Sequence, residues 1–157
     1  AILLHHLLKN ELKDWQLRIF ATDINRKILT QAAEGLYSRE QLSDTKLGII
    51  DEYFTPEEKS FRLKPAIRQL VHFSVDDLAC AETTAPALSI FGGFDLVLCR
   101  NLLIYFNLTT KLRSIQKLTK TLTRNGTLIL GESEWLPESL LTTFAELDHH
   151  NRIFRKK

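Results

Sequence analysis

The sequence of 157 residues has few cysteines. The two present, Cys80 and Cys99, lie far apart and form no pair of the metal-binding or redox type. This usage is typical of a reducing compartment, and we expect both thiols to be packing residues. A disulfide between them is compatible with the count but is not needed.

Long hydrophobic runs and an excess of charge are also missing. Charged residues interrupt every apolar stretch before the roughly 18 residues that a membrane-spanning helix needs, and no signal peptide opens the chain. The net charge is only +2, and the one basic cluster, residues 152–157, is interpreted as a solvated chain end. We therefore expect a cytoplasmic protein that neither inserts into a membrane nor binds nucleic acid.

Histidines are few, and their arrangement does not indicate a metal site. Four of the five occur as the adjacent pairs His5-His6 and His149-His150, and the fifth is His72. Adjacent side chains point to different sides of a helix or strand, so we do not expect them to share a metal ion.

What the sequence does contain is an apolar fraction of 44%, sufficient for one domain with a core. Apolar runs that indicate strands alternate with amphipathic patterns that indicate helices, which predicts an α/β fold with a mostly parallel sheet. Strands are expected at 17–21, 70–73, 94–99 and 127–130. Core-facing helices are expected at 1–13, 24–33 and 112–122, with Asn125-Gly126 closing the last. Residues 79–93 are expected to form an irregular loop, and residues 144–154 a terminal antiparallel hairpin. We expect one domain over residues 1–157, with a small β-hairpin subdomain inserted at 53–64.

The inserted hairpin has two interpretations. Its exposed edge could bind a peptide that adds a strand, or the hairpin could simply cover part of the core. The sequence does not decide between them.

The run FDLVLCRNLLIYF, residues 94–106, is the most distinctive stretch. Its first half predicts a strand buried on both faces, which stops abruptly at Arg100-Asn101. Open α/β sheets bind ligands beyond the carboxyl ends of their strands, so this polar pair is a candidate binding site. An ordinary polar loop in which Asn101 caps another element is the alternative.

Asp23 follows the predicted strand 17–21 in the same way. One carboxylate at a strand end can accept a hydrogen bond from each of the two hydroxyls of a ribose. Equally, Asp23 could cap the helix that follows it.

Several motifs together resemble a known family. In order and spacing, the chain is similar to the chemotaxis receptor methyltransferases of the CheR type at ATDIN (21–25), GLYS (35–38), FRLKP (61–65), FDLVLCRNLLIYF (94–106) and LILGESE (128–134). The resemblance implies a class I, Rossmann-like methyltransferase that uses S-adenosylmethionine to methylate glutamate side chains of bacterial chemoreceptors. The implied partner is the cytoplasmic domain of such a receptor.

The resemblance also implies roles for particular residues. Asp23 would hold the ribose, Asp77 and Leu78 would lie near the adenine, and many relatives have asparagine in place of Asp77. Arg100 and Asn101 would line the cofactor pocket. As candidate catalytic residues, Tyr105 would lie close to the transferred methyl group and Arg100 would orient a carboxylate or shape the loop. The alternative for Tyr105 is a core aromatic with its hydroxyl at the surface. The hairpin at 53–64 would be the subdomain that docks a receptor tail in some members, although its turn is short here.

One part of the family pattern has no counterpart in this sequence. The glycine-rich cofactor loop and the first strand of the sheet are missing, since no glycine pair, including Gly92-Gly93, follows a strand and opens a helix. We therefore expect a carboxyl-terminal piece of a longer protein that by itself binds cofactor weakly or not at all. The strands that end at Asp23 and Cys99 should each lack one neighbour.

Two other functions remain open from the sequence. A receptor-binding or partner-binding module that has lost catalysis would fit the missing cofactor loop. A dinucleotide oxidoreductase would fit Asp23, but the absent glycine fingerprint and the CRNLLIYF run disfavour it.

Overall fold

The computed structural model describes residues 1–9, 11, 14–80 and 93–157. They form two compact units, residues 1–76 and residues 77–157. The end of the predicted first helix, including Leu12, and most of the predicted loop 79–93 lie outside the described residues. Within the described part of the chain, no helix is both long and apolar enough to span a membrane.

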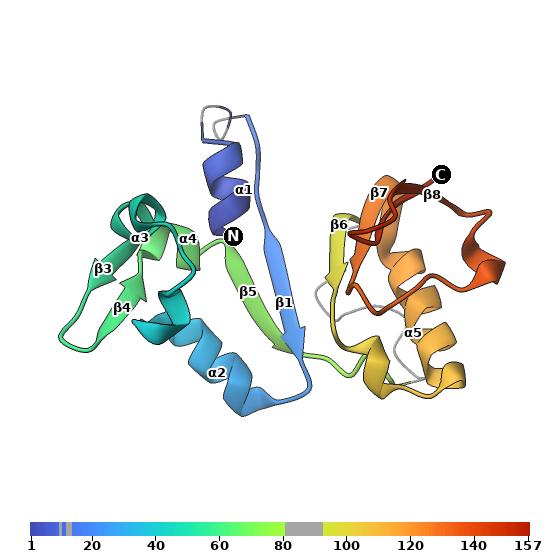
Figure 1. Ribbon diagram of the computed structural model, residues 1–157, viewed down its shortest axis with the longest axis horizontal. Coiled ribbons are helices and arrows are strands. Elements are labelled where there is room, and N and C mark those ends of the chain that lie inside the picture. The colour runs from blue at the N-terminus through green and yellow to red at the C-terminus, as the bar shows by residue number, and fades with distance from the viewer. Residues whose placement is uncertain (10, 12–13, 81–92) are drawn as a thin grey trace. The chain divides into compact units, whose positions relative to one another are not determined.

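The first unit contains a pair of parallel strands. Strand β1 (Ile19–Asp23) pairs with β5 (Val71–Val75), and helix α2 (Arg26–Glu34) packs against both (Figure 1). The helix ends at Gly35, whose φ of +63° is the left-handed conformation that glycine adopts without strain. The predicted strands and helix are confirmed, and each strand lies about two residues later than expected.

A three-stranded antiparallel sheet completes the first unit. The predicted hairpin is confirmed as β3 (Phe54–Pro56) and β4 (Ser60–Leu63), and β2 (Leu36–Ser38) pairs with the other side of β4. The sequence did not predict β2, because three residues are too few for a periodic signal. Two short helices, η1 (Glu40–Leu42) and α3 (Leu47–Tyr53), connect β2 to β3, and a third, α4 (Pro65–Arg68), leads from β4 to β5.

Helix α1 (Ile2–Leu7) differs from the prediction. It is much shorter than residues 1–13, and none of its residues is buried. Leu3 and Leu7, which the sequence assigned to the core, are exposed, whereas Ile2 packs against the core of the first unit. The two adjacent histidines also do not point apart, since Nδ1 of both His5 and His6 lies within 3.4 Å of the Tyr53 hydroxyl.

The second unit is built on a four-stranded sheet. Strand β6 (Phe94–Cys99) runs parallel to β7 (Leu122–Leu130), which pairs antiparallel with β9 (Ile153–Lys156). Strand β8 (Phe144–Asp148) pairs with β9 at the far edge, so the predicted terminal hairpin is confirmed (Figure 1). A short helix, η4 (Glu138–Leu140), precedes β8.

Helix α5 (Leu108–Thr121) packs against β7 and covers the core of the second unit. The prediction that it continues to Asn125-Gly126 is wrong, because Leu122 already pairs with Phe94 and opens β7. Asn125 has a φ of +66° within an irregularity of the β6–β7 pairing, so these turn residues distort a strand rather than end a helix. Lys117, a charged residue of this helix, is buried.

The prediction that β6 is buried on both faces is also wrong. Leu98 is 64% exposed, and Leu96 is exposed as well. Among the described residues, β6 pairs only with β7, and β1 pairs only with β5. Each of these strands therefore lies at the edge of its own sheet, which agrees with the expectation that each lacks a neighbour.

Candidate functional site

Asp23 is the last residue of β1, and its carboxylate organises the turn that follows. Its Oδ1 accepts a hydrogen bond of 2.7 Å from the backbone N–H of Asn25. The Asn25 side chain in turn accepts from the N–H groups of Lys27 and Ile28 at the start of α2. Asn25 is therefore the cap of α2, and the alternative that Asp23 caps this helix is wrong.

Asp77 and Leu78 open the second unit and are held by α5. The buried ammonium group of Lys117 donates to the backbone oxygen of Asp77 at 3.3 Å, and the Ser114 hydroxyl donates to that of Leu78 at 3.2 Å. The Asp77 carboxylate accepts from the N–H of Ala79. Leu78 packs against the core, whereas the Asp77 side chain is exposed.

Arg100 and Asn101 follow directly after β6, as predicted. Both are exposed, and Asn101 has a φ of +58°. The alternative in which Asn101 caps another element is wrong, because the helix that follows it, η3 (Leu103–Tyr105), has no side-chain cap and α5 is capped by Asn107.

Tyr105 ends η3 and is 79% exposed. The alternative of a core aromatic is therefore wrong. Its ring is available to a ligand or substrate that approaches this face of the second unit.

Sequence reasoning missed one residue that shapes this site, namely Glu134. Its side chain is 1% exposed, and its two carboxylate oxygens accept hydrogen bonds from the backbone N–H groups of Asn101, Leu102, Leu103 and Gly131. These bonds tie the loop after β6 to the loop after β7. The LILGESE motif contains this residue, but nothing in the motif distinguishes buried Glu134 from exposed Glu132.

Gly131 is where the two loops approach most closely. A Cβ atom at this position would lie 2.5 Å from Oδ1 of Asn101 and 2.8 Å from Oε2 of Glu134. Both distances are well below van der Waals contact, so only glycine fits without a shift of the loop.

Cys99, the last residue of β6, is a buried free thiol. Burial, and to a smaller extent the negative charge of Glu134, raise its pKa to about 12. The thiol is therefore protonated at neutral pH and is not a nucleophile.

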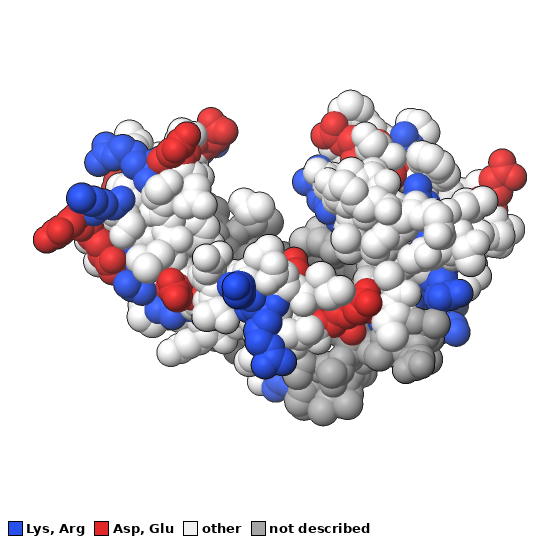
Figure 2. Space-filling model, turned by 90° about the horizontal axis from the view of Figure 1, so that it is seen from below, with Lys and Arg blue, Asp and Glu red and all other residues white. Residues whose placement is uncertain are grey.

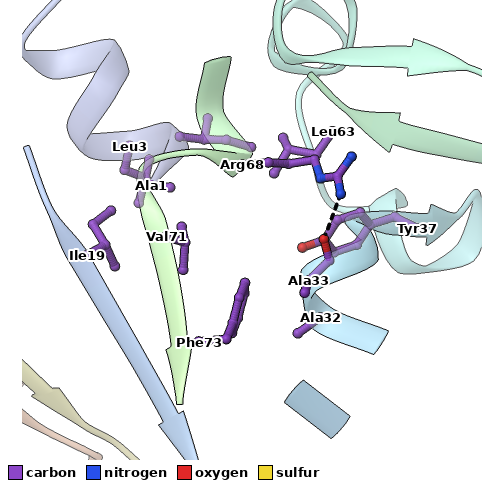
Figure 3. Close-up of a pocket in the computed structure, with 11 residues that line it drawn as sticks. Ala1, Leu3, Ile19, Ala32, Ala33, Tyr37, Leu63, Arg68, Val71 and Phe73 are labelled. Atoms are coloured by element: carbon purple, nitrogen blue, oxygen red, sulfur yellow. Dashed lines mark hydrogen bonds between the residues drawn. The ribbon is translucent and has the colours of Figure 1, made fainter. Parts of the chain in front are cut away.

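A cavity of about 360 Å³ lies in the first unit but contains none of the predicted site residues. Figure 3 shows its mainly apolar walls, which include Ile19, Tyr37 and Phe73. The Arg68 guanidinium at its rim donates to the backbone oxygen of Ala33 in the last turn of α2, where a cation is favourable. We assign the residues that line this cavity a packing role in the first unit.

Charged side chains of both signs lie on the described surface of each unit. On the face seen in Figure 2, basic and acidic residues are interspersed over the surfaces of both units. This pattern agrees with the small net charge of the sequence.

The predicted site residues thus divide between the units. Asp23 belongs to the first unit, and Asp77, Leu78, Arg100, Asn101 and Tyr105 belong to the second. Within the second unit, α5 binds the backbone of residues 77 and 78, and it begins at Leu108, shortly after residues 100–105.

Curated chemotaxis methyltransferases match most of this chain. The chain is 31% identical to the chemotaxis protein methyltransferase of Escherichia coli K12, covering 74% of this chain and 41% of that protein. It is 32% identical to chemotaxis protein methyltransferase 2 of Vibrio cholerae serotype O1, covering 84% of this chain and 44% of that protein. The chain therefore spans less than half the length of these two relatives.

A solved structure of N-methyltransferase NodS from Bradyrhizobium japonicum WM9 with S-adenosyl-L-homocysteine matches with a TM-score of 0.49. It is 13% identical, and the match covers 88% of this chain and 66% of that chain. The family assignment does not depend on this likeness. The family model described as CheR methyltransferase, SAM binding domain, matches residues 1–152. The chain therefore belongs to the CheR methyltransferase family, as part of its SAM-binding domain.

Proposed function

We propose that this chain is the cofactor-binding and catalytic part of a protein-glutamate O-methyltransferase. The enzyme would transfer a methyl group from S-adenosylmethionine to glutamate carboxylates of bacterial chemoreceptors. The observation that carries the proposal is the family match over residues 1–152, which includes every predicted site residue. The two units would then act as one domain.

The described residues fit S-adenosylmethionine. Asp23 uses Oδ1 for one backbone hydrogen bond, and an ionised carboxylate has about four acceptor positions, so it retains capacity for two ribose hydroxyls. Arg100 and Asn101 are exposed beyond a parallel strand, as ligand-binding residues of open α/β sheets are. Asp77 and Leu78 would hold the adenine. Tyr105 would lie near the methyl group.

The reaction requires little acid or base catalysis. A glutamate side chain has an ordinary pKa of about 4.3 and is already an anion at neutral pH. The cofactor supplies a methyl group on a positively charged sulfur, so formation of the carbon–oxygen bond and cleavage of the carbon–sulfur bond leave a neutral ester and S-adenosylhomocysteine, without proton transfer. The protein contributes alignment of the reacting atoms and exclusion of water.

Tyr105 and Arg100 are suited to those two tasks. An exposed tyrosine can cover the incoming carboxylate and remove water from it. A guanidinium can orient a carboxylate through paired hydrogen bonds, so Arg100 would direct the substrate or shape the loop.

The proposed partner is the cytoplasmic domain of a methyl-accepting chemoreceptor, which would place the protein in the cytoplasm. The proposal includes neither a nucleic-acid partner nor insertion into a membrane. The hairpin at 53–64 is a candidate site for a receptor tail, because β3 is one of the two edge strands of its sheet in the described part of the chain. Pro56 lacks an N–H donor, so a peptide would form fewer backbone hydrogen bonds there. Titrating a receptor carboxyl-terminal peptide, with the amide signals of Phe54 and Thr55 as readout, tests this part.

Calorimetric titration of the full-length protein with S-adenosylhomocysteine tests the main proposal, together with transfer of a labelled methyl group to a receptor cytoplasmic domain. We expect binding and transfer. Binding of the receptor domain with neither cofactor binding nor transfer would instead support the non-catalytic partner module.

Asp23→Ala tests the ribose assignment. We expect its affinity for S-adenosylhomocysteine to fall by at least about tenfold, as loss of a ligand hydrogen bond to a charged group predicts. Asp51→Ala removes an exposed carboxylate from α3 of the same unit and should leave the affinity unchanged. Equal affinities of the two variants would contradict the assignment.

A further inference from the structure

Glu134 determines the backbone conformation of the loop after β6. Its Oε1 accepts hydrogen bonds from Leu102 N–H at 2.9 Å and Leu103 N–H at 2.7 Å. Its Oε2 accepts from Asn101 N–H at 3.1 Å and Gly131 N–H at 2.7 Å. Three consecutive N–H groups that converge in this way form an anion-binding turn, which here is occupied by the protein's own carboxylate.

The buried charge of Glu134 has a specific use. A carboxylate removed from water is unfavourable unless hydrogen bonds compensate, and N–H groups that donate to a charged oxygen form strong bonds. No lysine or arginine among the described residues forms an ion pair with Glu134, so the backbone N–H groups supply the compensation. The consequence is that the loop conformation depends on this one side chain.

Asn101 is the residue most affected. Its φ of +58° is uncommon for a residue other than glycine, although asparagine tolerates it better than most. Its N–H is bound by Glu134, and its side-chain oxygen lies directly over Gly131. Asn101 is thus held from both sides by residues of the loop after β7.

We propose that Glu134 is a positioning residue of the methyl-transfer site. It holds Asn101 in the left-handed conformation and thereby sets where the side chains of Arg100 and Asn101 are presented. This inference rests on the proposed function, in which those side chains line the cofactor pocket. Glu134 acts through them and not by contact with the cofactor.

The first test compares Glu134→Gln with Glu132→Gln in the full-length protein. The amide of Glu134→Gln has the size of the carboxylate but directs an NH₂ group at two of the backbone N–H groups. We expect its affinity for S-adenosylhomocysteine to fall by at least about tenfold, the scale found when a ligand-orienting partner is lost. Glu132 is exposed in the same loop, so Glu132→Gln should bind like the unmodified protein.

A double-mutant cycle separates positioning from general stabilisation. Asn101→Gly removes the amide side chain, while glycine still tolerates the left-handed conformation. If Glu134 acts through Asn101 and Arg100, adding Glu134→Gln to Asn101→Gly should weaken binding of S-adenosylhomocysteine less than Glu134→Gln does in the unmodified protein, because only the positioning of Arg100 remains to be lost. Losses that simply add would overturn the positioning role, provided that circular dichroism shows all variants to be folded.

Gly131→Ala decides the question if Glu134→Gln does not fold. It keeps the charge of Glu134 but pushes a methyl group against Asn101 and should weaken binding by at least about fivefold. Gly48→Ala is the matched control, because a Cβ atom at Gly48 would contact nothing within 4 Å. Unchanged binding by Gly131→Ala would overturn the inference.

Absence of binding by the unmodified protein would overturn the proposed function and this inference together, whereas binding unaffected by either loop variant would overturn this inference alone.

Discussion

The strand ends that carry Asp23 and Asn101 are stabilised in different ways. After β1, the side-chain hydrogen bonds are local, since Asp23 binds the N–H of Asn25, and Asn25 binds the first turn of α2. After β6, the loop is held by Glu134, which lies 33 residues beyond Asn101 in the sequence and is buried. The difference shows that two polar strand ends that look alike in sequence can depend on very different parts of the chain.

The largest expected effect is that of Glu134→Ala, which leaves four backbone N–H groups without their acceptor. We expect the free energy of unfolding to fall by at least about 3 kcal/mol, because each unpaired buried donor is unfavourable. Urea denaturation followed by the fluorescence of Trp135, in a Trp15→Phe background, measures this change. Glu132→Ala is the control, and a loss below about 1 kcal/mol for Glu134→Ala would remove the contrast between the two loops.

Gly131→Ala should have the next largest effect on stability. The added methyl group overlaps Asn101 and Glu134, and overpacking of this kind is unfavourable by about 2 kcal/mol. Gly48→Ala in α3 should instead be neutral or stabilise by about 0.5 kcal/mol, because alanine restricts the unfolded chain more than glycine does. Thermal unfolding of both variants measures the difference, and equal melting temperatures would contradict the close approach of the loops.

A smaller effect is expected for the loop after β1. Asn25→Ala removes the cap of α2 and should lower the free energy of unfolding by about 1 kcal/mol, as cap removal does in other helices. Asn107→Ala, which removes the cap of α5, should have a similar effect. Denaturation curves test both, and a loss for Asn25→Ala as large as that for Glu134→Ala would mean that the loops do not differ.

The smallest expected effect on stability near neutral pH is that of the protonation of Cys99. Burial and the charge of Glu134 raise its pKa from 9.0 to about 12, so the folded state keeps a proton that the unfolded state loses between these values. The contribution of Cys99 to stability is therefore complete below pH 9 and decreases as the pH rises towards 12.

Alkylation with iodoacetamide at pH 8, followed by mass spectrometry, should modify the partly exposed Cys80 much faster than Cys99. Rapid modification of Cys99 in the folded protein would contradict its burial and protonation. Denaturation curves between pH 8 and pH 10 measure the decrease in the contribution of Cys99 to stability.

Patterns within short segments predicted much of this molecule. The strand at 94–99, the hairpin at 53–64 and the terminal hairpin were predicted from short apolar runs and from turn residues that are neighbours in sequence, and all three are confirmed. The reciprocal bonds between Ser38 and Gln41 also follow from a spacing of three residues. Predictions failed where pairing partners decide, as for the end of α5 at Thr121 and the exposure of Leu98.

The sequence by itself determined the family, the alternation of strands and helices, and the place of Asp23 and of Arg100-Asn101 at the carboxyl ends of parallel strands, because each depends on local order. Only the tertiary structure decided that Tyr105 is exposed and that Glu134 rather than Glu132 is buried. The physical reason is that a carboxylate can accept hydrogen bonds from any N–H group that the fold brings near it. Such partners are set by how segments pack together, which the order of the residues does not reveal.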